Sequence, residues 1–167
     1  MVNLLFTSQM WHMPAAAFGE PELTVRDEIR PAIVIDPLER FRGAKSLSDE
    51  ELVTLLKEIG FEGKALKVAW AVAKKESSGN PRNHNGNRNT GDNSYGIFQI
   101  NMIDSLGEKR RDKYDLENNK ELFDPVTNAE IAYQMSNGGK DWSAWKVYPG
   151  QKNGERYEMY LKNFPGN

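Results

Sequence analysis

The sequence predicts a mainly helical α+β domain that carries one small β-flap. Three stretches, 48–60, 64–76 and 124–138, place apolar residues at helical spacing between residues that start and stop helices. The segment 80–93 between the second and third stretches is rich in asparagine and glycine and contains the turn signals Asn-Gly and Gly-Asp. We therefore expect helices around one core, interrupted by a small hairpin or an irregular flap.

The composition excludes several classes of function. A chain of 167 residues is long enough for one domain with a core. Its net charge of −2 offers no basic excess for nucleic acid or a membrane surface, and no stretch has the roughly 18 apolar residues of a membrane span. The sequence has no cysteine, and its two histidines, His12 and His84, lack acidic residues at ligand spacing. We expect no disulfide, no metal and no cofactor.

The chain divides into an extended N-terminal arm, residues 1–45, and a folded domain, residues 46–167. The arm contains four prolines, Pro14, Pro21, Pro31 and Pro37. Residues 33–35 are apolar and β-branched, which favours a short strand. No basic residue precedes Arg26, so we expect no secretory signal. The arm either contacts a partner, such as a virion or tail protein, or is a flexible leader.

The folded domain is expected to begin with an ordinary packing helix. Ser48 and Glu51 have the spacing of a capping box, and Gly60 ends the apolar pattern. Further helices are predicted around 104–114, after Asp124 as N-cap, and in the tail from 155 to 164. Trp145, near the end of the domain, is expected in the core.

The second helix ends in a glutamate on its apolar side. Glu76 follows Val72 and Ala73 by four and three residues, so helical spacing continues their face through it. Burying a carboxylate without a partner is costly, and burial favours the protonated form that a general acid needs. The alternative is a helix-end glutamate that turns to solvent.

Two motifs at this point resemble those of a known superfamily. Residues 76–81 read Glu-Ser-Ser-Gly-Asn-Pro, and residues 87–101 read Asn-Arg-Asn-Thr-Gly-Asp-Asn-Ser-Tyr-Gly-Ile-Phe-Gln-Ile-Asn. Together they resemble the catalytic core of the lysozyme superfamily, in particular the soluble lytic transglycosylases and goose-type lysozymes. The resemblance covers roughly residues 48–148. It implies a lysozyme-like fold with a substrate cleft between lobes, and Glu76 as the catalytic acid.

The resemblance also implies which residues contact substrate. Matching positions lie beside the acid and along the flap: Ser77, Asp92, Ser94, Tyr95, Gly96, Ile97, Phe98, Gln99 and Asn101. Gly96 permits a close backbone approach. Gln99 needs hydrogen-bond partners if it is buried, and a structural role is its alternative. On the helix after Asp124, Asn128 or Tyr133 is placed near the cleft, with simple packing as the alternative.

The sequence lacks one carboxylate that a retaining glycosidase uses. Animal lysozymes carry an aspartate directly before the Tyr-Gly pair, where this chain has Ser94. Lytic transglycosylases need only the single glutamate. Asp92, two residues earlier, is the alternative base for an attacking water. We expect single-acid chemistry, and the choice between hydrolase and transglycosylase stays open.

The expected activity is cleavage of the β-1,4 bond between N-acetylmuramic acid and N-acetylglucosamine in peptidoglycan glycan strands. Phage cell-wall degradation fits the cysteine-free composition, with the enzyme carried in the virion or released to the bacterial wall. The alternatives are a non-catalytic virion or wall-binding protein with the same fold, and a chitinase-like hydrolase.

Overall fold

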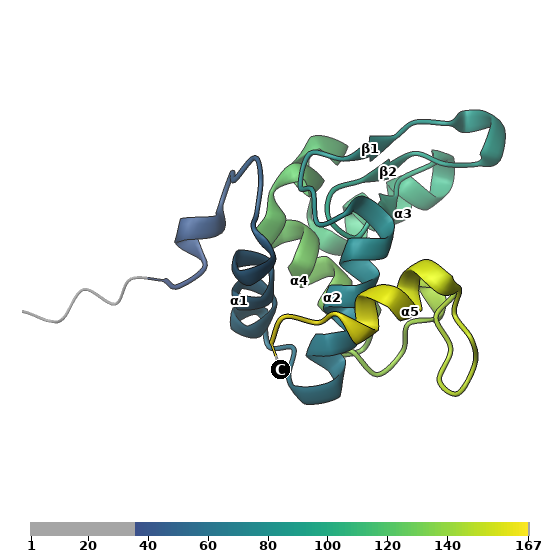
Figure 1. Ribbon diagram of the computed structural model, residues 1–167. Coiled ribbons are helices and arrows are strands. Elements are labelled where there is room, and N and C mark those ends of the chain that lie inside the picture. The colour runs from purple at the N-terminus through teal and green to yellow at the C-terminus, as the bar shows by residue number, and fades with distance from the viewer. Residues whose placement is uncertain (1–35, 167) are drawn as a thin grey trace, which may run out of the picture. The chain divides into compact units, whose positions relative to one another are not determined.

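The computed structural model describes residues 36–166, apart from the side chain of Arg88. This part is mainly helical with one small antiparallel sheet, as the sequence predicts (Figure 1). Its α-helices are α1 (Asp49–Ile59), α2 (Gly63–Ser77), α3 (Asp104–Tyr114), α4 (Pro125–Met135) and α5 (Glu155–Lys162). Its strands are β1 (His84–Asn85), β2 (Ser94–Tyr95) and β3 (Ile100–Asn101). Short 3₁₀ turns are η1 (Glu39–Phe41), η2 (Arg88–Thr90), η3 (Asn119–Phe123) and η4 (Ser143–Trp145).

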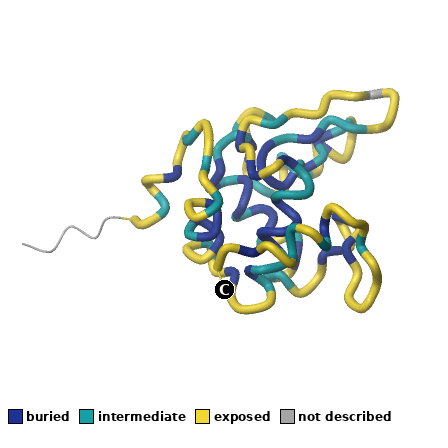
Figure 2. The backbone as a smooth tube through the Cα atoms, viewed as in Figure 1, coloured by how far each residue is buried: buried dark blue, intermediate teal, exposed yellow. Residues whose placement is uncertain are grey.

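Helix α2 is packed between two other helices. It lies against α1 on one side and α5 on the other, and α1 also packs against α4 (Figure 1). Ala69, Ala71, Val72 and Ala73 are fully buried, because small side chains let the neighbouring helices approach closely. Most of the buried backbone in Figure 2 belongs to α2 and the segments around it. The C-terminal end of α2 is therefore held by the core on several sides.

The predicted starts of α1 and α4 and the predicted end of α1 are confirmed. The Ser48 hydroxyl accepts the Glu51 N–H, the Glu51 carboxylate accepts the Ser48 N–H, and Gly60 closes α1 with a φ of 111°. Asp124 caps α4 by accepting the N–H of Thr127. Helix α4 ends at Met135, two residues before the last position that a stop at Gly138 allows, because the backbone at 137–139 has positive φ values.

The flap is a three-stranded antiparallel sheet in the order β1-β2-β3. His84 pairs with Tyr95, and Tyr95 pairs with Ile100 on its other side. This outcome confirms the predicted small hairpin. The turn between β2 and β3 runs into the core, where Ile97 and Phe98 have no exposed surface. The sheet is thus anchored by the apolar turn that joins its last two strands.

Part of the predicted arm packs on the folded domain. Phe41 in η1 is 4% exposed, and the Gly43 N–H donates to the Asp124 carboxylate at 2.5 Å. Residues 1–35, which include the strand expected at 33–35, lie outside the described residues. Among the residues described, no helix combines the length and the apolar character needed to cross a membrane.

Gly96, at the start of that turn, allows the closest backbone approach in the flap. Its φ is +75°, and a Cβ atom built there would lie 2.2 Å from the Leu122 carbonyl oxygen and 2.3 Å from the Asn128 Nδ2. Neither neighbour can move away easily, because one is backbone and the other is fully buried. The close approach predicted from the sequence is confirmed.

We expect Gly96→Ala to lower the free energy of unfolding by about 3 kcal/mol or more, because overpacking and a positive φ each cost about 1–3 kcal/mol. Gly91→Ala is the matched control, since Gly91 also has a positive φ of +70° but no atom within 4 Å of the added Cβ. It should lose only about 1 kcal/mol. Urea denaturation measures both variants, and equal losses would show that the contact at Gly96 is unimportant.

Candidate active site

Glu76 lies in the last turn of α2 and is neither buried nor fully exposed. Its side chain is 24% exposed, and its Oε1 is 3.1 Å from the Nζ of Lys75. The carboxylate continues the face of Val72, but at the helix end, where that face meets solvent. The arrangement presents an acid at the surface of the domain, with a cation beside it and the core beneath it.

Ser77, the residue after the acid, ties the end of α2 to the flap. Its hydroxyl is 2.7 Å from the Ile97 carbonyl oxygen and accepts the N–H of Gly79 at 3.1 Å. The side chain is buried, so both bonds are shielded from water. Ser77, which the sequence places at the substrate, therefore fixes the end of α2 against the β2–β3 turn.

A second connection to this turn passes through Trp145. Its Nε1–H donates to the Phe98 carbonyl at 2.8 Å, and its own carbonyl accepts from the Lys75 Nζ at 3.1 Å. Trp145 is 6% exposed, which confirms its predicted place in the core. The lysine that pairs with Glu76 is therefore held in position from its other side.

Asn128 of α4 satisfies the backbone of the turn. Its Nδ2 donates to the carbonyls of Tyr95 at 3.0 Å and Leu122 at 2.9 Å, and its Oδ1 accepts the Phe98 N–H at 2.9 Å. The side chain is fully buried, so these hydrogen bonds are shielded from water. Asn128 supports the turn from inside the domain.

The other residues of the turn also hold it from within. Ile97 and Phe98 are core residues with no exposed side chain. Gln99 has a φ of 47°, and its Nε2 donates to the carbonyls of Asn83 and Gly96 at 3.1 and 2.9 Å. Gln99 thus joins the segment before β1 to the turn after β2, which corresponds to the structural alternative expected from the sequence.

Asp92 is oriented within the flap. One carboxylate oxygen accepts from the Ser94 hydroxyl, and the other accepts from the Asn85 Nδ2 at 2.6 Å. Close by, the Asn101 Oδ1 accepts the N–H of Asn93 at 3.1 Å. Asp92, Ser94 and Asn101 therefore form part of the hydrogen bonding that shapes the flap.

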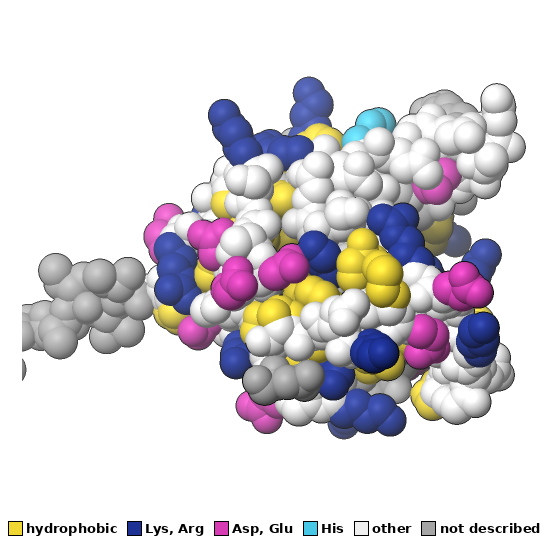
Figure 3. Space-filling model, in the orientation of Figure 1, with side chains coloured by type: hydrophobic (Ala, Val, Ile, Leu, Met, Phe, Trp, Pro, Cys, Tyr) yellow, Lys and Arg dark blue, Asp and Glu magenta, His cyan; other side chains and the backbone are white. Residues whose placement is uncertain are grey.

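An aromatic cluster on the flap was missed by the sequence reasoning. The Tyr95 ring lies 4.4 Å from the His84 ring and 5.3 Å from the Phe123 ring, measured between centroids. His84 is exposed, and the histidine colour is visible on the face drawn in Figure 3. The cluster depends on the strand pairing that sets His84 opposite Tyr95. No spacing in the sequence fixes that register, so the sequence alone did not predict the cluster.

Tyr133 lies in the packing between α4 and α1. Its ring meets Phe61 edge-on with centroids 4.9 Å apart and stands beside Gly60 and Gly138. Tyr133 therefore packs within the domain, which is the alternative to a place near the cleft that the sequence left open. In the described part of the chain, no three His, Asp or Glu side chains gather closely enough to hold a metal ion.

The end of α2, which bears Glu76, is bonded to the β2–β3 turn through Ser77, and both belong to the motifs singled out in the sequence. A comparison with protein families finds that the profile described as a lysozyme-like domain matches residues 53–147. The chain belongs to this family. No curated protein matches it. The matched range begins in α1 and ends after Trp145. It therefore includes Glu76 and every residue whose hydrogen bonds are described in this section. The fold is lysozyme-like, and the family places the chain with peptidoglycan-cleaving glycosidases.

The stability of the lysozyme-like domain should depend on the side-chain amide of Asn128. Asn128→Asp keeps the shape but replaces two donors with a carboxylate facing two carbonyls, so we expect a loss of about 3 kcal/mol or more in unfolding free energy. Asn89→Asp, on the exposed turn η2, is the matched control and should change stability by less than about 0.5 kcal/mol. Thermal or urea unfolding measures the stability of both variants. Equal midpoints for the two variants would refute the role assigned to Asn128.

Proposed function

We propose that this lysozyme-like domain cleaves the N-acetylmuramic acid to N-acetylglucosamine β-1,4 bond of peptidoglycan, with Glu76 as its single catalytic acid. The observation that carries the proposal is the position of Glu76. The helix end that bears it is fixed through Ser77 and Lys75, while its carboxyl group still reaches solvent. A general acid needs this combination of fixed geometry and access to substrate.

The proposed chemistry uses the carboxyl group twice. Protonated Glu76 donates its proton to the glycosidic oxygen as the bond from that oxygen to the anomeric carbon breaks, and the substrate's N-acetyl group assists at that carbon. The 6-hydroxyl of the same sugar then attacks the anomeric carbon, and the ionised Glu76 takes its proton. The product ends in a 1,6-anhydro ring, and no water is consumed. The ammonium group of Lys75, 3.1 Å away, stabilises the carboxylate between the two steps.

The hydrogen bonds of Asp92 favour the route in which Glu76 is the single acid. Both of its carboxylate oxygens already accept from side chains of the flap, Ser94 and Asn85. These two bonds fix the orientation of the carboxylate within the flap. We therefore assign Asp92 to the shape of the flap and favour the transglycosylase outcome over hydrolysis.

The substrate is proposed to cross the flap beside Glu76. Tyr95 with His84 offers aromatic surface, which suits the apolar face of a sugar ring. We propose a role in phage attack on the bacterial wall, with delivery in the virion or by release to the wall. The segment before residue 46 is proposed as an arm that contacts virion or tail proteins.

Glu76→Gln should lower the release of soluble fragments from purified peptidoglycan by at least about 10²-fold, because it removes the proton donor. Glu58→Gln, an exposed carboxylate on α1, is the control and should leave the rate unchanged. Circular dichroism verifies the fold of both. A folded Glu76→Gln variant that cleaves near the wild-type rate excludes Glu76 as the acid. A wild type that cleaves chitin oligomers in place of peptidoglycan favours the chitinase-like alternative, and one that binds walls without cleaving them favours the binding protein.

Mass spectrometry of the products separates the two fates of the intermediate. We expect fragments ending in 1,6-anhydro-N-acetylmuramic acid, each one water lighter than the hydrolysis product. Asp92→Asn should keep that product and lose less than about tenfold in rate, whereas loss of a general base typically costs about 10²–10⁴-fold. Products from the wild type that carry only reducing ends would overturn the transglycosylase assignment.

A further inference from the structure

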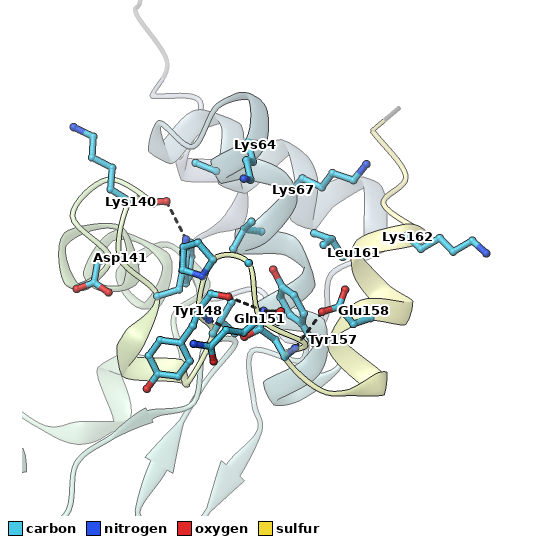
Figure 4. A pocket seen from close by; sticks show the side chains of 18 residues that line it. Lys64, Lys67, Lys140, Asp141, Tyr148, Gln151, Tyr157, Glu158, Leu161 and Lys162 are labelled. Carbon is cyan, nitrogen blue, oxygen red and sulfur yellow. Dashed lines mark hydrogen bonds between the residues drawn. The ribbon is translucent and has the colours of Figure 1, made fainter.

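A cavity of about 810 Å³ opens between the N-terminal half of α2, the segment 139–153 and α5 (Figure 4). Glu76 is not among the residues that line it. Cavities of roughly 300–1,000 Å³ are typical of sites for small ligands. The cavity is therefore large enough to hold a ligand of its own, at a place separate from the proposed catalytic acid.

Hydrogen bonds and close packing hold the walls of the cavity in place. The Trp142 Nε1–H donates to the Gly139 carbonyl at 3.0 Å, and a Cβ atom built at Gly139 would lie 2.6 Å from the Cβ of Ala65. In the loop 148–153, the side-chain amide of Asn153 accepts the Tyr148 N–H at 2.7 Å and donates to the Tyr148 carbonyl at 3.1 Å. The cavity is thus formed before any ligand enters it.

The inner surface of the cavity is mostly apolar. Trp142, Val147 and Tyr157 line it and are otherwise buried, at 6%, 5% and 3% exposed. Val68 from α2 and Leu161 from α5 add aliphatic side chains. Because apolar surface gains free energy when it leaves water, such walls favour a ligand with an apolar body.

The charged side chains at the edge of the cavity do not make it a site for an ion. Asp141 and Glu158 already accept backbone N–H groups, from Ser143 at 2.9 Å and from Asn153 at 3.1 Å. Lys64 is exposed at the start of α2. The other three lysines extend away from the cavity in Figure 4: Lys67, Lys140 and Lys162. A charged ligand would lose its water here without gaining a fixed partner, so the interior favours a neutral one.

Among the buried side chains that line the cavity, one polar group has no hydrogen-bond partner in the described part of the chain. That group is the hydroxyl of Tyr157, whose ring is directed into the cavity from the start of α5 in Figure 4. Burial, and then the nearby carboxylate of Glu158, raise the pKa of Tyr157, so its hydroxyl keeps its proton at neutral pH. A buried hydroxyl without a partner is costly. A ligand that brings a hydrogen-bonding group to this point would remove that cost.

We propose that this cavity binds a small neutral molecule made of an apolar ring or chain that carries a single hydroxyl group. The apolar part lies against Trp142 and Val147, and the hydroxyl pairs with that of Tyr157. A ligand held between α2, the loop and α5 stabilises the folded domain by mass action. Because Glu76 lies outside the cavity, this site is independent of the cleavage proposed above.

The test uses the full chain and four probes that share one skeleton. The neutral probe is 4-phenyl-1-butanol, the charged probes are 4-phenylbutyrate and 4-phenylbutylamine, and butylbenzene lacks the hydroxyl. In titration calorimetry we expect the alcohol to bind, butylbenzene to bind about fivefold more weakly, which is the size of one net hydrogen bond, and both ions to bind at least about tenfold more weakly.

Nuclear magnetic resonance of the methyl groups reports where the alcohol binds. The methyl signals of Val68, Val147 and Leu161, which line the cavity, should shift on its addition. Those of Leu52 and Leu55, which are buried elsewhere in the core, should not. Shifts at the core leucines without shifts at the cavity would overturn the proposal.

The decisive variant is Tyr157→Phe, which removes the hydroxyl and keeps the ring. It should bind the alcohol about fivefold more weakly and bind butylbenzene as the wild type does, because only the hydrogen bond is lost. Its matched control is Tyr160→Phe, on the same helix but outside the cavity wall, which should leave the binding of both probes unchanged. Circular dichroism verifies the fold of both variants.

The competing results each contradict the proposal. Tightest binding of 4-phenylbutyrate would show that the lysines at the edge select an anion. Equal affinities for the four probes would show nonspecific binding to apolar surface. Equal weakening of alcohol binding in the two tyrosine variants would refute the pairing with Tyr157, and no binding of the alcohol up to its solubility would refute the site.

Discussion

The side chain of Asn128 holds together the part of the structure on which the candidate site depends. One buried amide pairs with the Tyr95 carbonyl before the β2–β3 turn, with the Phe98 N–H within it and with the carbonyl of Leu122. The turn approaches so closely because Gly96 has no side chain. Without this amide, three backbone groups would each lose a buried hydrogen-bond partner, which is costlier than the same loss at a surface.

The β2–β3 turn also fixes the end of α2. Its carbonyl groups at Ile97 and Phe98 point towards α2 and Trp145, and they accept from the hydroxyl of Ser77 and the indole of Trp145. The Lys75 ammonium joins the same network through the Trp145 carbonyl. Glu76 has no direct bond to the turn among those described, yet both of its neighbours are held. Its backbone is thereby rigid while its carboxyl group remains accessible.

The site and the cavity divide the length of α2 between them. The C-terminal end presents the acid, and the N-terminal half presents an apolar wall edged by lysines. The two ends of a helix also differ in electrostatic character, since free N–H groups gather at its start. The acid at Glu76 has a cation beside it in Lys75, and positive charge suits the C-terminal end of a helix. One helix thus supplies two chemically distinct surfaces.

The sequence by itself determined the helices, their caps and the motif that carries the acid. These features depend on residues a few positions apart, as in the capping box of Ser48 and Glu51 or the glycine at 96. The tertiary structure decided whether a motif residue faces substrate or supports the backbone. Asn128, Ile97 and Phe98 support it, because side chains from distant segments close around them. It also decided the His84–Tyr95 pairing and the lysine-edged cavity, since strand register and the meeting of α2 with α5 depend on contacts between segments far apart in the chain.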